Sequence, residues 1–257
     1  MKVFLNSFLF FFICLLLALV FTFPLRLALQ WVQLPKDLEI RAVDGSVFSG
    51  SLGRVSYREL PLHNVRYSLG WDCLTNLSIC VDFSFDEGQV VFEYFPLDKT
   101  AGIKQGNLLM PLNTPGLLPQ NLLVKPKGDV LIKSVSASVT QDKISDIVVL
   151  AEWQKAGIEG EEVNLGDYLI EISRDGDRYR ADFSDISGLL EVQGSSIIDA
   201  KSRYTMNVSI ATRAGTPQTY KNAIELVAKS KKPNQYELRK TGKIPKDLVT
   251  YLSFGGT

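Results

Sequence analysis

The sequence predicts a mainly β protein: an antiparallel β-meander, in curved or sandwich-like sheets, that follows a single N-terminal transmembrane helix and carries a few short helices. Three observations lead to this prediction. The chain opens with an uncharged segment, residues 3–25. The remainder repeats short stretches in which apolar and polar residues alternate, which is typical of strands with one buried face. Few later stretches have apolar residues at helical spacing.

The N-terminal segment predicts the membrane helix. Residues 8–21 form an unbroken apolar run, and Asp37 is the first acidic residue of the chain. About 20 apolar residues cross the hydrocarbon layer as a helix. A cleaved signal peptide would have a shorter apolar core and small residues at the cleavage site, which residues 23–27 do not offer. We therefore expect residues 1–30 to be a cytoplasmic tip with an uncleaved anchor, and residues 31–257 to be a periplasmic β-rich domain.

Alternating residues predict the strands. The apolar members of the plainest series are Val65, Tyr67, Leu69 and Trp71, then Ile79, Val81, Phe83 and Phe85, then Tyr204, Met206, Val208 and Ile210. The clearest hairpin runs over residues 168–183, with Gly176 in the turn, where a positive φ is needed. Short turns between successive strands favour a meander.

Two helices and one connector complete the prediction. Thr216 is expected to cap a helix that begins at Pro217 and ends near Lys229, and residues 244–252 are expected to form a terminal helix. Four prolines interrupt residues 111–126, where one helical turn is expected over residues 117–123. This connector predicts two lobes, residues 37–110 and 127–257.

Two cysteines follow the anchor. Cys73 and Cys80 are seven positions apart, a spacing that fits neither a zinc knuckle nor a redox Cys-x-x-Cys motif. A disulfide is expected in an oxidising compartment, and two free thiols are the alternative.

Composition argues against several function classes. The chain has 28 basic and 28 acidic residues, without the surplus of cations that nucleic-acid binding needs. His63 is the only histidine, and no nucleophile elbow, phosphate loop or metal motif is present. We expect a non-enzymatic protein with no catalytic residues, metal or cofactor.

Charge is unevenly distributed in the second half. Residues 151–199 hold twelve acids and four bases, a net of −8, whereas residues 221–246 hold eight bases and two acids, a net of +6. Two solvated faces or a surface that docks a partner would each explain this distribution.

Several short motifs resemble protein N of the bacterial type II (general) secretion system. They are Val43-Asp44-Gly45-Ser46-Val47-Phe48-Ser49-Gly50, Leu62-His63-Asn64-Val65-Arg66-Tyr67, Leu165-Gly166-Asp167-Tyr168 and Ser187-Gly188-Leu189-Leu190-Glu191-Val192-Gln193-Gly194. Phe48 and Tyr67 stand where the family usually has Trp, and Ser187 replaces a Gly. The resemblance implies structural roles for Gly45, Phe48, Gly50, Tyr67, Gly166, Asp167, Gly188 and Gly194.

The resemblance also implies a location and partners. It implies a single-pass inner-membrane protein of a Gram-negative bacterium, with a cytoplasmic N-terminus. Its periplasmic part would support export by contacting the secretin or the inner-membrane platform. The alternative is a lipid-binding or lipid-transfer module similar to AsmA-like proteins, with an apolar groove in a curved sheet.

Overall fold

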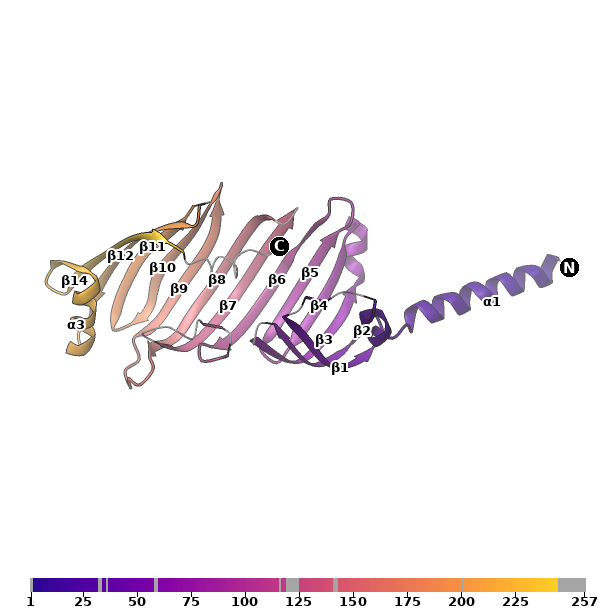
Figure 1. Ribbon diagram of the computed structural model, residues 1–257, viewed down its shortest axis with the longest axis horizontal. Coiled ribbons are helices and arrows are strands. Elements are labelled where there is room, and N and C mark those ends of the chain that lie inside the picture. The colour runs from indigo at the N-terminus through magenta and orange to yellow at the C-terminus, as the bar shows by residue number, and fades with distance from the viewer. Residues whose placement is uncertain are drawn as a thin grey trace.

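The computed structural model contains one 14-stranded antiparallel sheet in which nearly every strand pairs with its neighbours in sequence (Figure 1). It describes residues 2–31, 34–35, 37–57, 60–115, 117–118, 125–140, 143–199 and 201–244. The strand order is β1 to β12 without a break, followed by β14 and then β13. The predicted meander is thus confirmed, as a single sheet rather than a sandwich within the described residues.

The strands lengthen toward the middle of the sheet. Their bounds are β1 Leu38–Gly45, β2 Ser49–Tyr57, β3 Leu60–Gly70, β4 Ile79–Phe85, β5 Gly88–Phe95, β6 Thr100–Pro111, β7 Pro126–Thr140, β8 Lys143–Ile158, β9 Gly166–Asp175, β10 Arg178–Gly188, β11 Leu190–Ile198, β12 Arg203–Thr212, β13 Lys229–Lys232 and β14 Gln235–Lys243. The predicted hairpin is β9 and β10, joined by Gly176 and Asp177, and Gly176 has φ +60°.

In the part of the chain that the structure describes, four helical segments accompany the sheet. α1 (Lys2–Phe21) projects from the end where β1 lies, α2 (Leu25–Leu29) follows it, and the 3-10 helix η1 (Trp71–Asn76) joins β3 to β4 (Figure 1). α3 (Gln218–Val227) lies at the opposite end. Among the described residues, none of the helices is both long enough and apolar enough to cross a membrane. The predicted transmembrane helix is therefore not confirmed.

The helix predicted after Thr216 exists, but its cap differs from the prediction. Pro217 is the N-cap residue, and no side chain caps the first turn of α3. The Thr216 hydroxyl instead lies 2.9 Å from the Leu189 carbonyl oxygen and 2.8 Å from the Arg213 carbonyl oxygen, either of which can accept its single hydrogen. The predicted terminal helix over residues 244–252, apart from Ile244, and most of the predicted helical turn over residues 117–123 lie outside the described residues.

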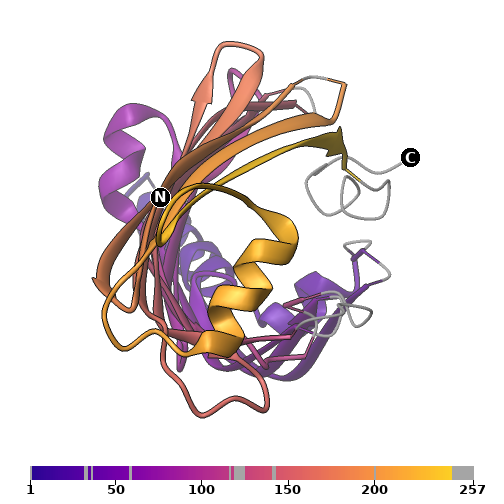
Figure 2. The ribbon, with the colours of Figure 1, turned by 90° about the vertical axis from the view of Figure 1, so that its left-hand side faces the viewer.

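The sheet curves around one side, and α3 lies inside the curve (Figure 2). Two core clusters pack on this concave side. The N-terminal cluster is built on Leu52, Val65 and Tyr67. The C-terminal cluster combines residues of the sheet with Tyr220 and Ile224 of α3 and with Ala228, the residue that follows α3. β6 and β7 pair across the proline-containing connector, so the sheet is continuous there. The division into two lobes stays a prediction.

Candidate functional site

The concave side of the sheet is apolar from β2 to β14, and we call it the apolar face. The pairing register places its residues in rows that cross the strands. One row contains Tyr67, Phe83 and Val90, and another contains Met110, Val130, Trp153 and Tyr168. Side chains of the opposite face are mainly polar, as the row Glu171, Asp182, Ser195, Asn207 and Arg239 illustrates. This alternation is expected of an antiparallel sheet with one face withdrawn from water.

The two core clusters cover only the ends of the apolar face. Between the two clusters, the residues of the apolar face belong to neither cluster and are half-buried. They are Val90, Ile103, Val135, Ala137, Val149, Ile172 and Phe183. Phe92 and Tyr94 of β5 remain 46 % and 43 % exposed. Within the described residues, the middle of the apolar face thus has no covering helix.

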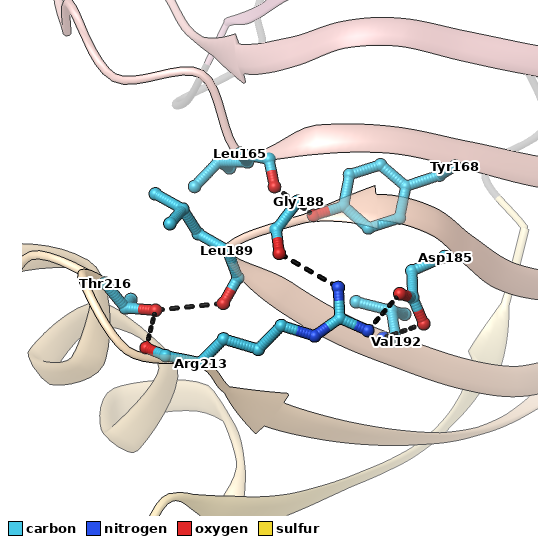
Figure 3. Close-up of polar contacts among 8 residues, drawn as sticks. All are labelled: Leu165, Tyr168, Asp185, Gly188, Leu189, Val192, Arg213 and Thr216. Atoms are coloured by element: carbon cyan, nitrogen blue, oxygen red, sulfur yellow. Dashed lines mark hydrogen bonds and ion pairs between the residues drawn. The ribbon is translucent and has the colours of Figure 1, made fainter.

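A polar network fastens the segment before α3 to the edge of the C-terminal cluster (Figure 3). The Arg213 guanidinium donates to the Gly188 carbonyl at 2.9 Å and pairs with the Asp185 carboxylate at 2.6 Å. The other carboxylate oxygen of Asp185 accepts the Val192 amide at 3.2 Å. Asp185 shares the apolar face with Tyr168, and its side chain is only 13 % exposed. The network therefore neutralises a carboxylate on an apolar surface and holds α3 over it.

Buried tyrosines line the same cluster. The Tyr168 hydroxyl donates to the Leu165 carbonyl at 3.1 Å. Burial, reinforced by the negative charge of Asp185, raises the pKa of Tyr168 to about 12. Burial also raises the pKa of Tyr220, whose hydroxyl has no hydrogen-bond partner among the described residues. Both groups are neutral at physiological pH because deprotonation would place a charge in an apolar cluster.

Four of the glycines implied by the family resemblance form two facing pairs. Gly166 lies opposite Gly188 across β9 and β10, and Gly45 lies opposite Gly50 across β1 and β2. A Cβ on Gly188 would lie 2.5 Å from the Gly166 Cα and 2.2 Å from the Leu165 carbonyl oxygen, and the φ of Gly188 is +138°. A Cβ on Gly50 would lie 2.2 Å from the Asp44 carbonyl oxygen. Only glycine permits these backbone approaches.

The other residues implied by the resemblance support the same two ends of the sheet. Tyr67 is 7 % exposed, and its hydroxyl donates to the Ser46 carbonyl beside Gly45. The Asp167 carboxylate accepts the Lys155 amide at 2.7 Å. A Cβ added at Gly194 would point at the Asn207 carbonyl and at Val208 of β12. Their contacts lie within the sheet, and their roles in function stay a prediction.

The predicted disulfide is present. Cys73 and Cys80 are bonded, and their side chains are 5 % and 1 % exposed. Glu93 lies beside the two sulfurs, so the three residues have the proximity of a metal site. Bonded sulfurs are not thiolates and do not ligate a metal as thiolates do.

The two charged stretches lie near one another in the C-terminal half. In the acidic stretch, Asp182 pairs with Arg180 at 2.8 Å and Asp199 pairs with Arg203 at 2.7 Å. The Arg180 guanidinium lowers the pKa of Asp182, and the backbone amide of Arg203, followed by its guanidinium, lowers the pKa of Asp199. In the basic stretch, all four residues of β13 are exposed, and three of them are lysines: Lys229, Lys231 and Lys232. Lys231 pairs with Glu237 at 2.7 Å. β13 thus places basic side chains along one edge of the sheet.

The sequence motifs did not point to Asp185, Arg213 or the cover formed by α3. The separation of 28 residues between the two members of the ion pair left no local pattern to find. An acid among the apolar positions of β10 was the available signal, because such a charge needs a partner when the face is buried.

The fold and these surfaces define an open antiparallel β-meander protein with one apolar concave face and two close glycine pairs, one between β1 and β2 and one between β9 and β10. Residues 36–239 match the family model of the type II secretion system (T2SS) protein N, and the chain belongs to this family. No curated protein and no solved structure shows a significant match to the chain.

Proposed function

We propose that the protein is a non-enzymatic accessory component of type II secretion, held at the inner membrane by its N-terminal helix, with the sheet in the periplasm. The observation that carries the proposal is the family match over residues 36–239, which covers almost the whole sheet. Membership in this family makes a role in bacterial protein export the function to test.

Two features support the location. The side chains of residues 10–21 of α1 are exposed and apolar, which favours contact with lipid over contact with water. The Cys73–Cys80 disulfide is typical of proteins that fold in the oxidising periplasm. A non-enzymatic role is supported by the sequence, which has a single histidine, His63, and carries no nucleophile elbow, phosphate loop or metal motif.

The charged C-terminal edge is the surface that we assign to a partner in the secretion machine, either the secretin or the inner-membrane platform. Lysines of β13 provide an exposed row beside strand edges, and charge complementarity favours an acidic surface on the partner. A photo-crosslinking residue placed at Lys232 in secreting cells should capture a secretion component. The matched control carries the residue at Leu97, a 77 % exposed position in the turn between β5 and β6. Labelling of no secretion component from Lys232, or equal labelling from both positions, would contradict the proposal.

A lipid is the second candidate ligand. The observation that favours it is the uncovered middle of the apolar face, where Phe92 and Tyr94 are exposed. Native mass spectrometry of protein extracted with its membrane should detect bound lipid, and Phe92→Arg should remove it. Leu226→Arg, at an 87 % exposed position of α3, is the control and should retain the lipid. Lipid-free wild-type protein would contradict this candidate.

A further inference from the structure

The η1 loop presents apolar side chains to solvent at the end of the sheet nearest α1. Trp71, Leu74 and Leu77 are 52 %, 47 % and 68 % exposed. Leu77 ends the 3-10 helix with φ +56°, a left-handed conformation that is uncommon for a bulky residue. Packing in the core does not explain these three large apolar residues, because none of them belongs to either core cluster.

The interior of this loop is filled by other groups. The disulfide joins Cys73 and Cys80 beneath it, and Ser78 is fully buried. The Ser78 hydroxyl lies 3.1 Å from the Cys73 carbonyl and 2.7 Å from the Glu93 carboxylate. The disulfide, the Ser78 hydroxyl bond to Glu93 and the Ser78 amide bond to the Cys73 carbonyl at 3.2 Å thus hold the backbone of the loop, while its apolar side chains are exposed.

Contacts among three aromatic rings connect the loop to α1. Trp71 stacks on Phe48 with ring centroids 5.9 Å apart and planes 12° apart. Phe21, the last residue of α1, lies 4.9 Å from the Phe48 ring and 6.0 Å from the Trp71 ring. These three rings therefore connect the end of α1 to the first residue of the η1 loop.

We propose that the η1 loop is a second lipid contact: Trp71 lies at the interface between lipid and water, and Leu74 and Leu77 enter the lipid surface beside α1. The inference rests on the proposed location of the protein at the inner membrane. Trp favours the membrane interface because its ring is apolar and its N–H remains hydrated. Two contacts, one at α1 and one at η1, fix the direction in which the sheet leaves the membrane.

Quenching of tryptophan fluorescence by brominated lipid tests the proposal. The full chain is reconstituted in phosphatidylethanolamine–phosphatidylglycerol vesicles with or without bromine on the acyl chains. One variant retains only Trp71 (Trp31→Phe, Trp153→Phe), and its matched control retains only Trp153. The loss of fluorescence caused by bromine should be at least about twofold larger for Trp71 than for Trp153. The reason is that only an interfacial ring lies close to the acyl chains.

Two further measurements separate the possible failures. Vesicle flotation reports the proposed membrane location independently, and protein that does not float would refute that location and this inference together. Floating protein whose Trp71 is quenched no more than Trp153 would overturn the η1 contact alone, and would assign the loop to another occupant. Leu77→Asp should lower the quenching of Trp71, whereas Leu226→Asp should not. If circular dichroism shows that a variant with several substitutions is misfolded, wild type is compared with the single variant Trp71→Phe. Bromine should then quench the variant less than wild type.

Discussion

Replacing Gly188 by Ala should weaken the C-terminal end of the sheet more than any change of similar size in a turn. The added methyl would meet only backbone atoms, the Leu165 carbonyl oxygen at 2.2 Å and the Gly166 Cα at 2.5 Å. Backbone atoms of a paired strand cannot rotate away as a side-chain tip can. β9 and β10 would have to separate where Gly188 also supplies the carbonyl that binds Arg213.

The magnitude follows from three contributions. A positive φ costs an L-residue about 1–2 kcal/mol. Loss of a hydrogen bond from a charged donor costs about 1–3 kcal/mol. Displacement of the paired strand adds to both, so we expect the free energy of unfolding to fall by about 3 kcal/mol or more. In urea this corresponds to a midpoint lower by about 1 M or more.

The assay is urea unfolding in detergent of the full chain that retains only Trp153 (Trp31→Phe, Trp71→Phe). The fluorescence of Trp153 is followed, because its ring lies 5.9 Å from that of Tyr168 in the affected cluster. Gly176→Ala is the matched control, because Gly176 also has a positive φ but a Cβ there would have no neighbour within 4 Å. The control should lose only about 1 kcal/mol. Equal midpoints for the two variants would refute the argument that the close approach of the glycine pair matters.

Three further predictions concern the same two ends of the sheet. Arg213→Ala leaves the Asp185 carboxylate without its cation on the apolar face, so stability should fall by about 1–3 kcal/mol and proteolysis before α3 should accelerate; Asp185→Asn should restore part of the loss, and equal losses in the single and double variants would contradict this. Burial raises the pKa of Tyr168 in the folded protein to about 12 from about 10, so its neutral form stabilises the fold below pH 10. This contribution of about 2–3 kcal/mol should disappear between pH 10 and 12. The free energies of unfolding of wild type and Tyr168→Phe should therefore converge in alkaline titrations, and a constant difference would count against the reasoning. Replacing both Cys73 and Cys80 by Ser should cost about 2–3 kcal/mol, since the bridge closes a short loop, and unchanged thermal unfolding would argue that the bridge is dispensable.

Local patterns predicted β3, β4, β9, β10 and β12, because each of these strands carries its own evidence, whereas no such series predicted β1, β2, β6 or β8. The alternation in β3 and the Gly176 turn need no knowledge of the rest of the molecule. The alternation could not distinguish a single curved sheet from a sandwich, because both bury one face of each strand. β13 escaped prediction for the opposite reason: all four of its residues are exposed, so no alternation marks it.

The candidate sites divide along the same line. A pair of cysteines seven positions apart allowed the disulfide to be predicted, and the family motifs marked glycines whose positions the structure explains by close backbone approach. The Asp185–Arg213 pair depends on a contact between distant strands, which one sequence does not display. The cap of α3 was misassigned because the Thr216 hydroxyl lies against the carbonyl oxygens of Leu189 and Arg213 instead of the first turn of the helix.

The meander has a consequence for how the protein is made and how its size can change. Apart from the exchange of β13 and β14, each strand pairs with the strand that precedes it in sequence. A chain synthesised from its N-terminus can therefore add strands to a growing edge without waiting for distant segments. An added or deleted hairpin would alter the number of strands and leave the topology intact, as in repeat proteins. The span between α1 and the basic edge at β13 is therefore a length that hairpin insertion or deletion can set.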